Sequence, residues 1–148
     1  MTAAQHPGMQ EIKHRFFAMR NGIVADALRK GGLPHSVIFG LQLPQLSEIA
    51  RSLEKDAELS RTLWADSGVR ESRLLACYLM PVDTLSAEEA QRMGESVATR
   101  EESDILAFRL LRYHPEAERL AAAFEKSENP ATVYLSEALR RNLAAMSE

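Results

Sequence analysis

The chain of 148 residues has one cysteine, few aromatic side chains and no long apolar run. The single cysteine, Cys77, excludes an intramolecular disulfide and any zinc site built from several cysteines. Because Cys77 lies in the apolar run LLACYLM, we expect it to be a small buried hydrophobe. No segment reaches the roughly 18 uncharged apolar residues of a membrane helix, and residues 1–15 lack the apolar core of a signal peptide. These absences favour a cytoplasmic protein without a membrane anchor.

The common catalytic and metal-binding patterns are also missing. There is no glycine-rich phosphate loop and no G-x-S-x-G elbow. The densest acidic cluster, Glu101, Glu102 and Asp104, suits the start of a helix, where carboxylates stabilise the positive end of the helix dipole. Neither a metal nor a cofactor is predicted, because the four histidines are scattered without an i, i+4 pair: His6, His14, His35 and His114.

Length and composition are those of an ordinary globular protein, with 26% charged and 45% hydrophobic residues. We expect one domain over residues 1–148, with residues 1–8 as a frayed lead-in. The net charge of -3 argues against a protein that coats nucleic acid non-specifically. Residues 1–51 carry six basic against three acidic side chains (+3), and residues 52–148 carry twelve against eighteen (-6).

Apolar periodicity predicts helices along almost the whole chain. Residues 57–80 form an αα-hairpin with a break at Ser67-Gly68, and the patterns on its two sides each repeat at helical spacing. A helix from Met9 to Leu28 ends at Gly31-Gly32. With no convincing strand, the fold is predicted to be all-α with seven or eight helices. The remaining helices are expected at residues 44–55, 86–99, 103–112, 116–126 and 131–146, with Ser86 and Ser103 as N-caps.

Residues 32–44 are the one stretch without a helical period. Pro34, Gly40 and Pro44 interrupt it, yet its side chains are too apolar for a loop lying in water. We interpret it as an ordered, buried connector packed under the hairpin.

An internal repeat indicates how the helices stack. LLACYLM at residues 74–80 and ILAFRLL at residues 105–111 share their apolar pattern at an offset of 31 residues. Each is preceded by a more polar helix and followed by a proline break. This period predicts a right-handed α-solenoid of antiparallel, HEAT-like helix pairs, and a compact helical bundle is the alternative.

Six arginines on the predicted inner helices are the candidate binding residues. Stacked along one concave side, they would form a ladder able to hold a phosphate backbone. The alternative is that each arginine pairs with a nearby carboxylate, such as Arg73 with Asp104. The six are Arg70, Arg73, Arg109, Arg112, Arg140 and Arg141.

The run FGLQLPQLSEIARSL, followed by LSRTLWADSGVRESRLLACYLM, resembles the N-terminal half of the DNA alkylation repair proteins. These are relatives of the bacterial 3-methyladenine and 7-methylguanine DNA glycosylases built from HEAT-like repeats. The resemblance implies a solenoid with a concave, positively charged face for double-stranded DNA, and structural roles for Trp64 in the core and for Glu71 at a helix start or beside an arginine. It covers residues 19–112, where Gly40, Pro44, Trp64 and Glu71 keep type and order.

Active members of that family carry two tryptophans followed by an Asp-x-x-Asp pattern, which would hold a cationic alkylated base. Here Asp104 matches the first aspartate, Ala107 replaces the second, and both tryptophans are missing. We therefore predict no catalytic set, with Asp104 as the one candidate, and a DNA- or protein-binding module. The alternatives are a glycosylase in which Asp104 acts with Trp64 or Tyr113, and a scaffold whose acidic C-terminal two-thirds meets a basic protein partner.

Overall fold

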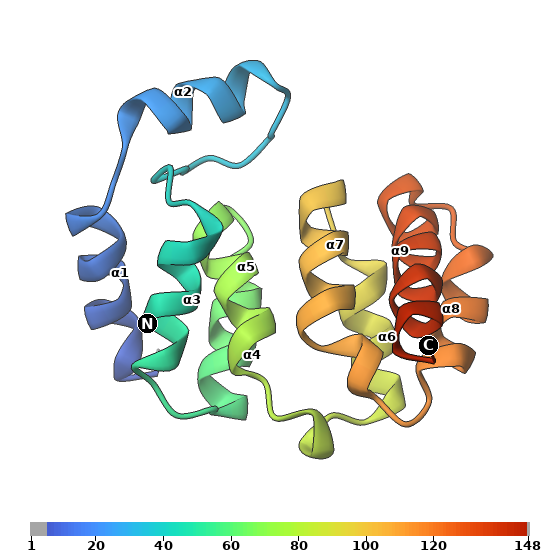
Figure 1. Ribbon diagram of the computed structural model, residues 1–148. Helices are drawn as coiled ribbons and strands as arrows, with labels where there is room; N and C mark the ends of the chain where they lie inside the picture. Colours follow the sequence, from blue (N-terminus) through green and yellow to red (C-terminus); the bar gives the residue numbers. More distant parts are fainter. Residues whose placement is uncertain (1–5, 148) are drawn as a thin grey trace, which may run out of the picture. The chain divides into compact units, whose positions relative to one another are not determined.

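The computed structural model describes residues 6–147, and α-helices joined by loops make up most of this range (Figure 1). They form nine α-helices and two short 3-10 helices, and within this range the single β-type contact is an isolated bridge between Val37 and Val69. The all-α prediction is confirmed. By its internal contacts the chain divides into two compact units, residues 1–80 and 81–148. The organisation as one domain stays a prediction, and the first five residues of the expected lead-in lie outside the described range.

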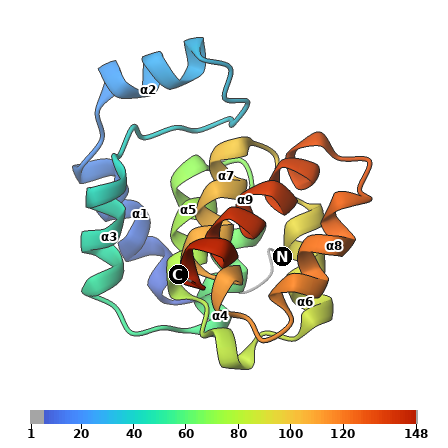
Figure 2. The same cartoon turned by 45° about the vertical axis from the view of Figure 1, so that its right-hand side comes forward.

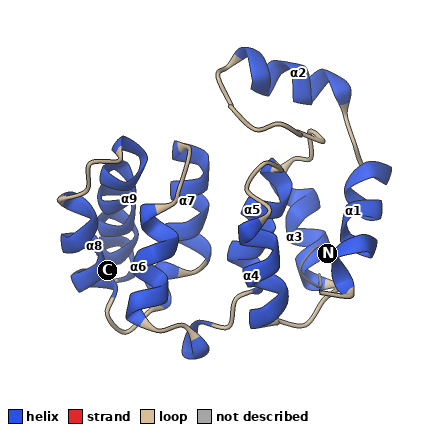
Figure 3. Cartoon of the chain, turned by 180° about the vertical axis from the view of Figure 1, so that it is seen from behind, coloured by secondary structure: helices blue, strands red, loops and turns tan. Residues whose placement is uncertain are grey.

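Five α-helices make the first unit, and its core is built around the predicted hairpin. Helices α4 and α5 pack against each other, α3 packs on α5, and α1 packs on α4. Helix α2 stands apart from the other four, above the connector that follows it (Figures 1 and 3). The helices are α1 (Gly8–Ala18), α2 (Gly22–Lys30), α3 (Leu43–Arg51), α4 (Ala57–Ala65) and α5 (Arg70–Leu79).

The prediction of one continuous helix over residues 9–28 is wrong. Helix α1 ends at Ala18, and Asn21 caps the start of α2 by accepting hydrogen bonds from the backbone N–H groups of Ile23 and Val24 at 3.0 and 3.2 Å. The Asn21 N–H donates to the Phe39 carbonyl at 2.8 Å, which ties the break to the connector. The helical spacing of apolar residues continues from α1 into α2, so this spacing does not reveal the break between the two helices. Splitting this helix raises the predicted count from eight to nine.

The connector before α3 is ordered, as predicted, because a buried carboxylate holds it. The fully buried Glu71 accepts hydrogen bonds from three consecutive backbone N–H groups, those of Phe39, Gly40 and Leu41, at 3.0, 3.0 and 3.3 Å. Arg70 Nη1 lies 2.8 Å from both the Glu71 carboxylate and the Leu41 carbonyl. The predicted structural role of Glu71, at a helix start and beside an arginine, is confirmed.

The second unit contains four α-helices and two 3-10 turns. Helix α9 packs against both α7 and α8, and α6 packs against α8. The contact with α6 is close because Gly94 has no side chain, and a Cβ there would lie 2.2 Å from Phe124 Cζ. The elements are η1 (Val82–Thr84), α6 (Ala87–Glu95), α7 (Arg100–Arg109), η2 (Leu111–Tyr113), α8 (Ala117–Glu125) and α9 (Pro130–Met146).

One of the two predicted caps in this unit is confirmed. Ser86 caps α6, and its hydroxyl accepts from the Glu89 N–H at 3.1 Å. The second cap is Thr99 instead of Ser103: the Thr99 hydroxyl accepts from the Glu102 N–H, and the Glu102 carboxylate accepts from the Ala98 N–H. Ser103 lies inside α7, buried, and donates to the Ala131 carbonyl at 2.7 Å. Helix α7 therefore begins three residues earlier than predicted, because Thr99 caps its first turn and Glu102 holds the preceding Ala98 N–H.

Candidate nucleic-acid interface

Two of the six candidate arginines lie inside the first unit. Arg70 and Arg73 on α5 are each 4% exposed. Arg70 holds Glu71 and the connector, and the Arg73 guanidinium lies over the ring of Trp64, 3.9 Å from its centroid. Both side chains therefore stabilise the interior of the unit. The predicted pair of Arg73 with Asp104 would join the two units and stays a prediction.

The other four arginines belong to the second unit, where Arg140 and Arg141 diverge. Arg140 Nη1 pairs with Glu125 of α8, at 2.6 Å from its carboxylate. Arg141 turns to α7, where its Nη2 lies 3.9 Å from Asp104 Oδ1, and its side chain is 62% exposed. The divergence follows from helix geometry, since consecutive residues are about 100° apart around the axis. Arg141 thus shares a surface with α7, and Arg140 does not.

The Arg112 guanidinium lies over two exposed aromatic rings. Its guanidinium carbon lies 4.1 Å from the centroid of Phe108 and 4.7 Å from that of Tyr113, and its Nη2 donates to the Tyr113 hydroxyl at 2.6 Å. Its Nε is buried without a hydrogen-bond partner among the described residues. Arg109 lies over the same Phe108 ring at 5.3 Å. Cation–π contacts with both rings therefore fix the position of a charged group at the surface.

A second cluster of this kind surrounds Tyr134 on α9. Arg100 and Arg141 lie 4.8 and 5.6 Å from its ring centroid. The Tyr134 hydroxyl donates to Asp104 Oδ1 at 2.8 Å. Asp104 therefore accepts a hydrogen bond from Tyr134 and lies beside Arg141.

We call the two clusters together the Arg–aromatic surface. Arg100, Asp104 and Phe108 follow one another at four-residue spacing on α7, so they share one helix face. Helices α7 and α9 pack against each other, and both contact η2 (Figures 1 and 2). The surface carries four arginines and one aspartate, in a unit with eight basic and thirteen acidic residues (-5). Its members are Arg100, Asp104, Phe108, Arg109, Arg112, Tyr113, Tyr134 and Arg141.

The surroundings of Asp104 do not match the constellation of an alkylpurine glycosylase. Its described contacts are with Tyr134 and Arg141, and the hydroxyl of Tyr113 accepts a hydrogen bond from Arg112 instead. Ala107, which stands where the family's second aspartate is expected, is fully buried. A carboxylate at that position would lie in the core of the unit, where an unpaired charge is strongly disfavoured.

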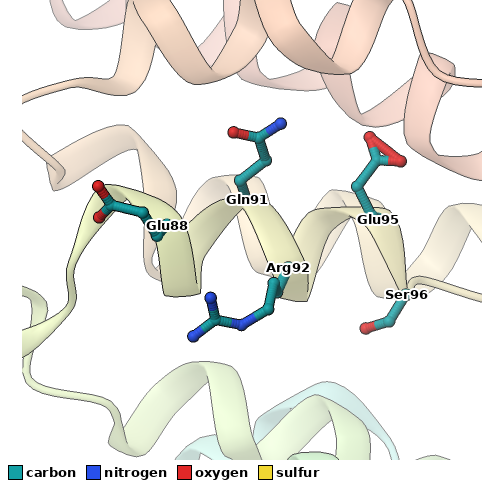
Figure 4. Close-up of a pocket in the computed structure, with 5 residues that line it drawn as sticks. All are labelled: Glu88, Gln91, Arg92, Glu95 and Ser96. Atoms are coloured by element: carbon teal, nitrogen blue, oxygen red, sulfur yellow. The ribbon is translucent and has the colours of Figure 1, made fainter.

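Other parts of the described chain offer no convergent chemical groups. Cys77 is 1% exposed, as expected for a structural cysteine. Figure 4 shows a hollow along α6 in which Glu88, Gln91 and Glu95 project to one side of the helix and Arg92 and Ser96 to the other. Within residues 6–147 no three His, Cys, Asp or Glu side chains are grouped so as to hold a metal ion. Over the same range, no helix combines the length and apolarity needed to cross a membrane.

Comparison with known proteins finds no matching family model, no similar curated protein and no similar solved structure. The resemblance to the DNA alkylation repair proteins therefore stays a prediction. The case for a function rests on the residues of the Arg–aromatic surface.

Three of the four arginines of this surface were predicted from the sequence, but its rings were assigned other roles. Phe108 was interpreted as part of the apolar stripe of its helix, yet it is 42% exposed. Arg100 and Tyr134 were not considered as binding residues. The four-residue spacing of Arg100, Asp104 and Phe108 is the sequence signal for Arg100 and Phe108, because residues so spaced form a continuous row on a helix.

Proposed function

We propose that this protein is a HEAT-like repeat DNA-binding module of the alkylation-repair class, without the usual glycosylase constellation. It binds the phosphate backbone through Arg109, Arg112 and Arg141 of the Arg–aromatic surface. Arg100, over the ring of Tyr134, lies on the same surface and is not counted among these phosphate contacts.

The helix contacts within each unit support stacked pairs over a bundle. In the first unit the pair α4 and α5 meets α1 through α4 and α3 through α5. In the second, the pair α8 and α9 meets α6 through α8 and α7 through α9. Each helix of a pair thus makes most of its remaining contact with a different neighbour, with a smaller contact between α6 and α9, as expected for stacked helix pairs.

The observation that carries the proposal is the way Arg112 is held. Two aromatic rings and the Tyr113 hydroxyl hold its guanidinium, so its orientation is preformed while its positive charge stays at the surface. A guanidinium has five N–H donors and matches a phosphate in a bidentate manner. Arg141, 62% exposed, adds a second charge on the adjacent helix. A preformed basic surface on a unit of net negative charge favours a specific polyanion site over general attraction.

The altered glycosylase is less well supported. A carboxylate that stabilises a developing cation has to face the reacting sugar. Asp104 instead accepts a hydrogen bond from Tyr134 and lies beside Arg141. We therefore assign Asp104 the role of positioning Tyr134 and Arg141.

The salt dependence of duplex DNA binding tests the proposal. Three phosphate contacts predict that log K falls against log salt with a slope of roughly -3, measured by fluorescence anisotropy between about 50 and 200 mM salt. The double variant Arg112→Gln/Arg141→Gln should lose roughly two units of that slope. Arg92→Gln/Arg119→Gln is the matched control, because it removes the same charge from exposed positions on α6 and α8. Absence of binding to any DNA, or an equal loss in the control, would overturn the proposal.

A further inference from the structure

The rings that hold Arg112 leave a large part of their own surface in water. Phe108 is 42% exposed and Tyr113 is 52% exposed. Within the described part of the second unit, Met146 is the other exposed large apolar side chain. The exposed aromatic area of this unit is therefore concentrated around one arginine, at the place where the proposed phosphate contact lies.

Rings at this position suit a DNA strand whose bases are unpaired. In a duplex the faces of the bases are stacked inside, so exposed aromatic side chains find only sugar, phosphate and groove edges. An unpaired strand presents an anion and a flat base in every nucleotide. The Arg112 guanidinium lies over both Phe108 and Tyr113, so a cation and exposed ring surface occur together, as an anion and a base do in each nucleotide.

We infer that the protein prefers single-stranded DNA, with a phosphate on Arg112 and the neighbouring bases stacked on Phe108 and Tyr113. This inference rests on the proposed DNA-binding function and adds the class of DNA that is bound. An acidic protein segment would satisfy the arginines but would leave both rings without a stacking partner. The second cluster, with Tyr134 between Arg100 and Arg141, repeats the combination of ring and cation along the same surface.

The experiment compares a labelled oligothymidylate of about 16 nucleotides, near the upper end of single-strand site sizes, with a duplex of equal length. The full chain is titrated into each, with Phe108→Leu and Tyr113→Leu in parallel. Each loss of a ring should weaken oligothymidylate binding by at least about fivefold and change duplex binding by less than about twofold. Phe17→Leu is the matched control, because Phe17 is also exposed (57%) and also carries an arginine over its ring, Arg20 at 3.8 Å.

A conservative variant of Tyr113 distinguishes base stacking on its ring from the effect of its hydroxyl on the position of Arg112. Tyr113→Phe keeps the ring and loses the hydrogen bond to Arg112, so oligothymidylate binding should stay within about twofold of wild type. Circular dichroism melting checks that each variant folds. Equal weakening of single-strand and duplex binding by the leucine variants would overturn the inference and leave the DNA-binding proposal standing. Tighter binding of oligouridylate than of oligothymidylate would contradict the assignment to DNA, and binding of no nucleic acid would overturn the proposed function itself.

Discussion

Arg70 and Arg112 are both arginines that sequence reasoning placed on a binding face, yet they have opposite environments. Arg70 is 4% exposed and bonded to Glu71 and to a backbone carbonyl. Arg112 is held at the surface by two rings. The difference arises from the connector of residues 31–42, which folds over the start of α5 and removes Arg70 from water. Helical periodicity describes one helix at a time, so it does not reveal burial by a distant loop.

Replacing the buried carboxylate of Glu71 should destabilise the first unit strongly. In Glu71→Gln one of the two acceptor oxygens becomes an NH2 group that faces backbone N–H donors, and Arg70 loses its buried partner. We expect a loss of about 3 kcal/mol in the free energy of unfolding, measured by urea denaturation. Glu58→Gln, at an exposed position on α4, is the control and should change stability by less than about 0.5 kcal/mol. A loss below about 1 kcal/mol for Glu71→Gln would contradict this account of the connector.

The titration of Asp56 predicts how stability depends on pH. Asp56 caps α4, and the hydrogen bond from the Leu59 N–H, with a further contribution from His6, holds the pKa of its carboxyl below the usual value of 3.8. The folded state thus favours the ionised carboxyl, and its contribution to stability is complete above the unfolded pKa and lost as the pH falls through the folded one. Asp56→Ala should cost about 1 kcal/mol at pH 7.

The control for Asp56 is Asp26→Ala, which removes an exposed carboxylate within α2. Urea denaturation of both variants and the wild type at pH 7 and at about pH 3 measures the effect. The difference between wild type and Asp56→Ala should shrink at the lower pH. If the free energies of unfolding of wild type and Asp56→Ala differ by the same amount at both pH values, the charge of Asp56 does not contribute to the cap.

At the scale of elements, the hairpin α4–α5 and the last two helices were predicted from their apolar spacing and are confirmed. Several boundaries were wrong, and two of them depend on side-chain caps. Asn21 starts α2 within an apolar pattern that continues at the same spacing, and Thr99 caps α7 four residues before the predicted serine. Capping is local hydrogen bonding, so the periodicity of apolar residues carries no information about it.

The packing of α6 against α8 and α9 depends on Gly94. A Cβ at this position would lie 2.2 Å from Phe124 Cζ and 3.0 Å from a Leu135 methyl carbon, both core side chains. Gly94→Ala should therefore lower the free energy of unfolding by roughly 2 kcal/mol, measured by thermal or urea denaturation. Gly22→Ala is the control, because no other atom lies within 4 Å of its Cβ position. It should be neutral or slightly stabilising, since alanine is the better helix former. Equal effects of the two variants would contradict the close contact.

At the scale of the whole molecule, the candidate site could be predicted only in part. Six arginines were predicted from the sequence as binding residues. Three of them, Arg109, Arg112 and Arg141, lie on the Arg–aromatic surface. The aromatic rings were missed because apolar side chains at helical spacing are normally core residues. Membership of the alkylation-repair class stays a proposal drawn from the resemblance of residues 19–112.

The most direct test of the central claim is the salt slope of DNA binding for wild type and for Arg112→Gln/Arg141→Gln, measured in one anisotropy series. The account predicts a wild-type slope of roughly -3 and a variant slope nearer -1, with the Arg92→Gln/Arg119→Gln control close to wild type. Equal slopes for wild type and Arg112→Gln/Arg141→Gln would show that the Arg–aromatic surface does not contact phosphate, and would contradict the account.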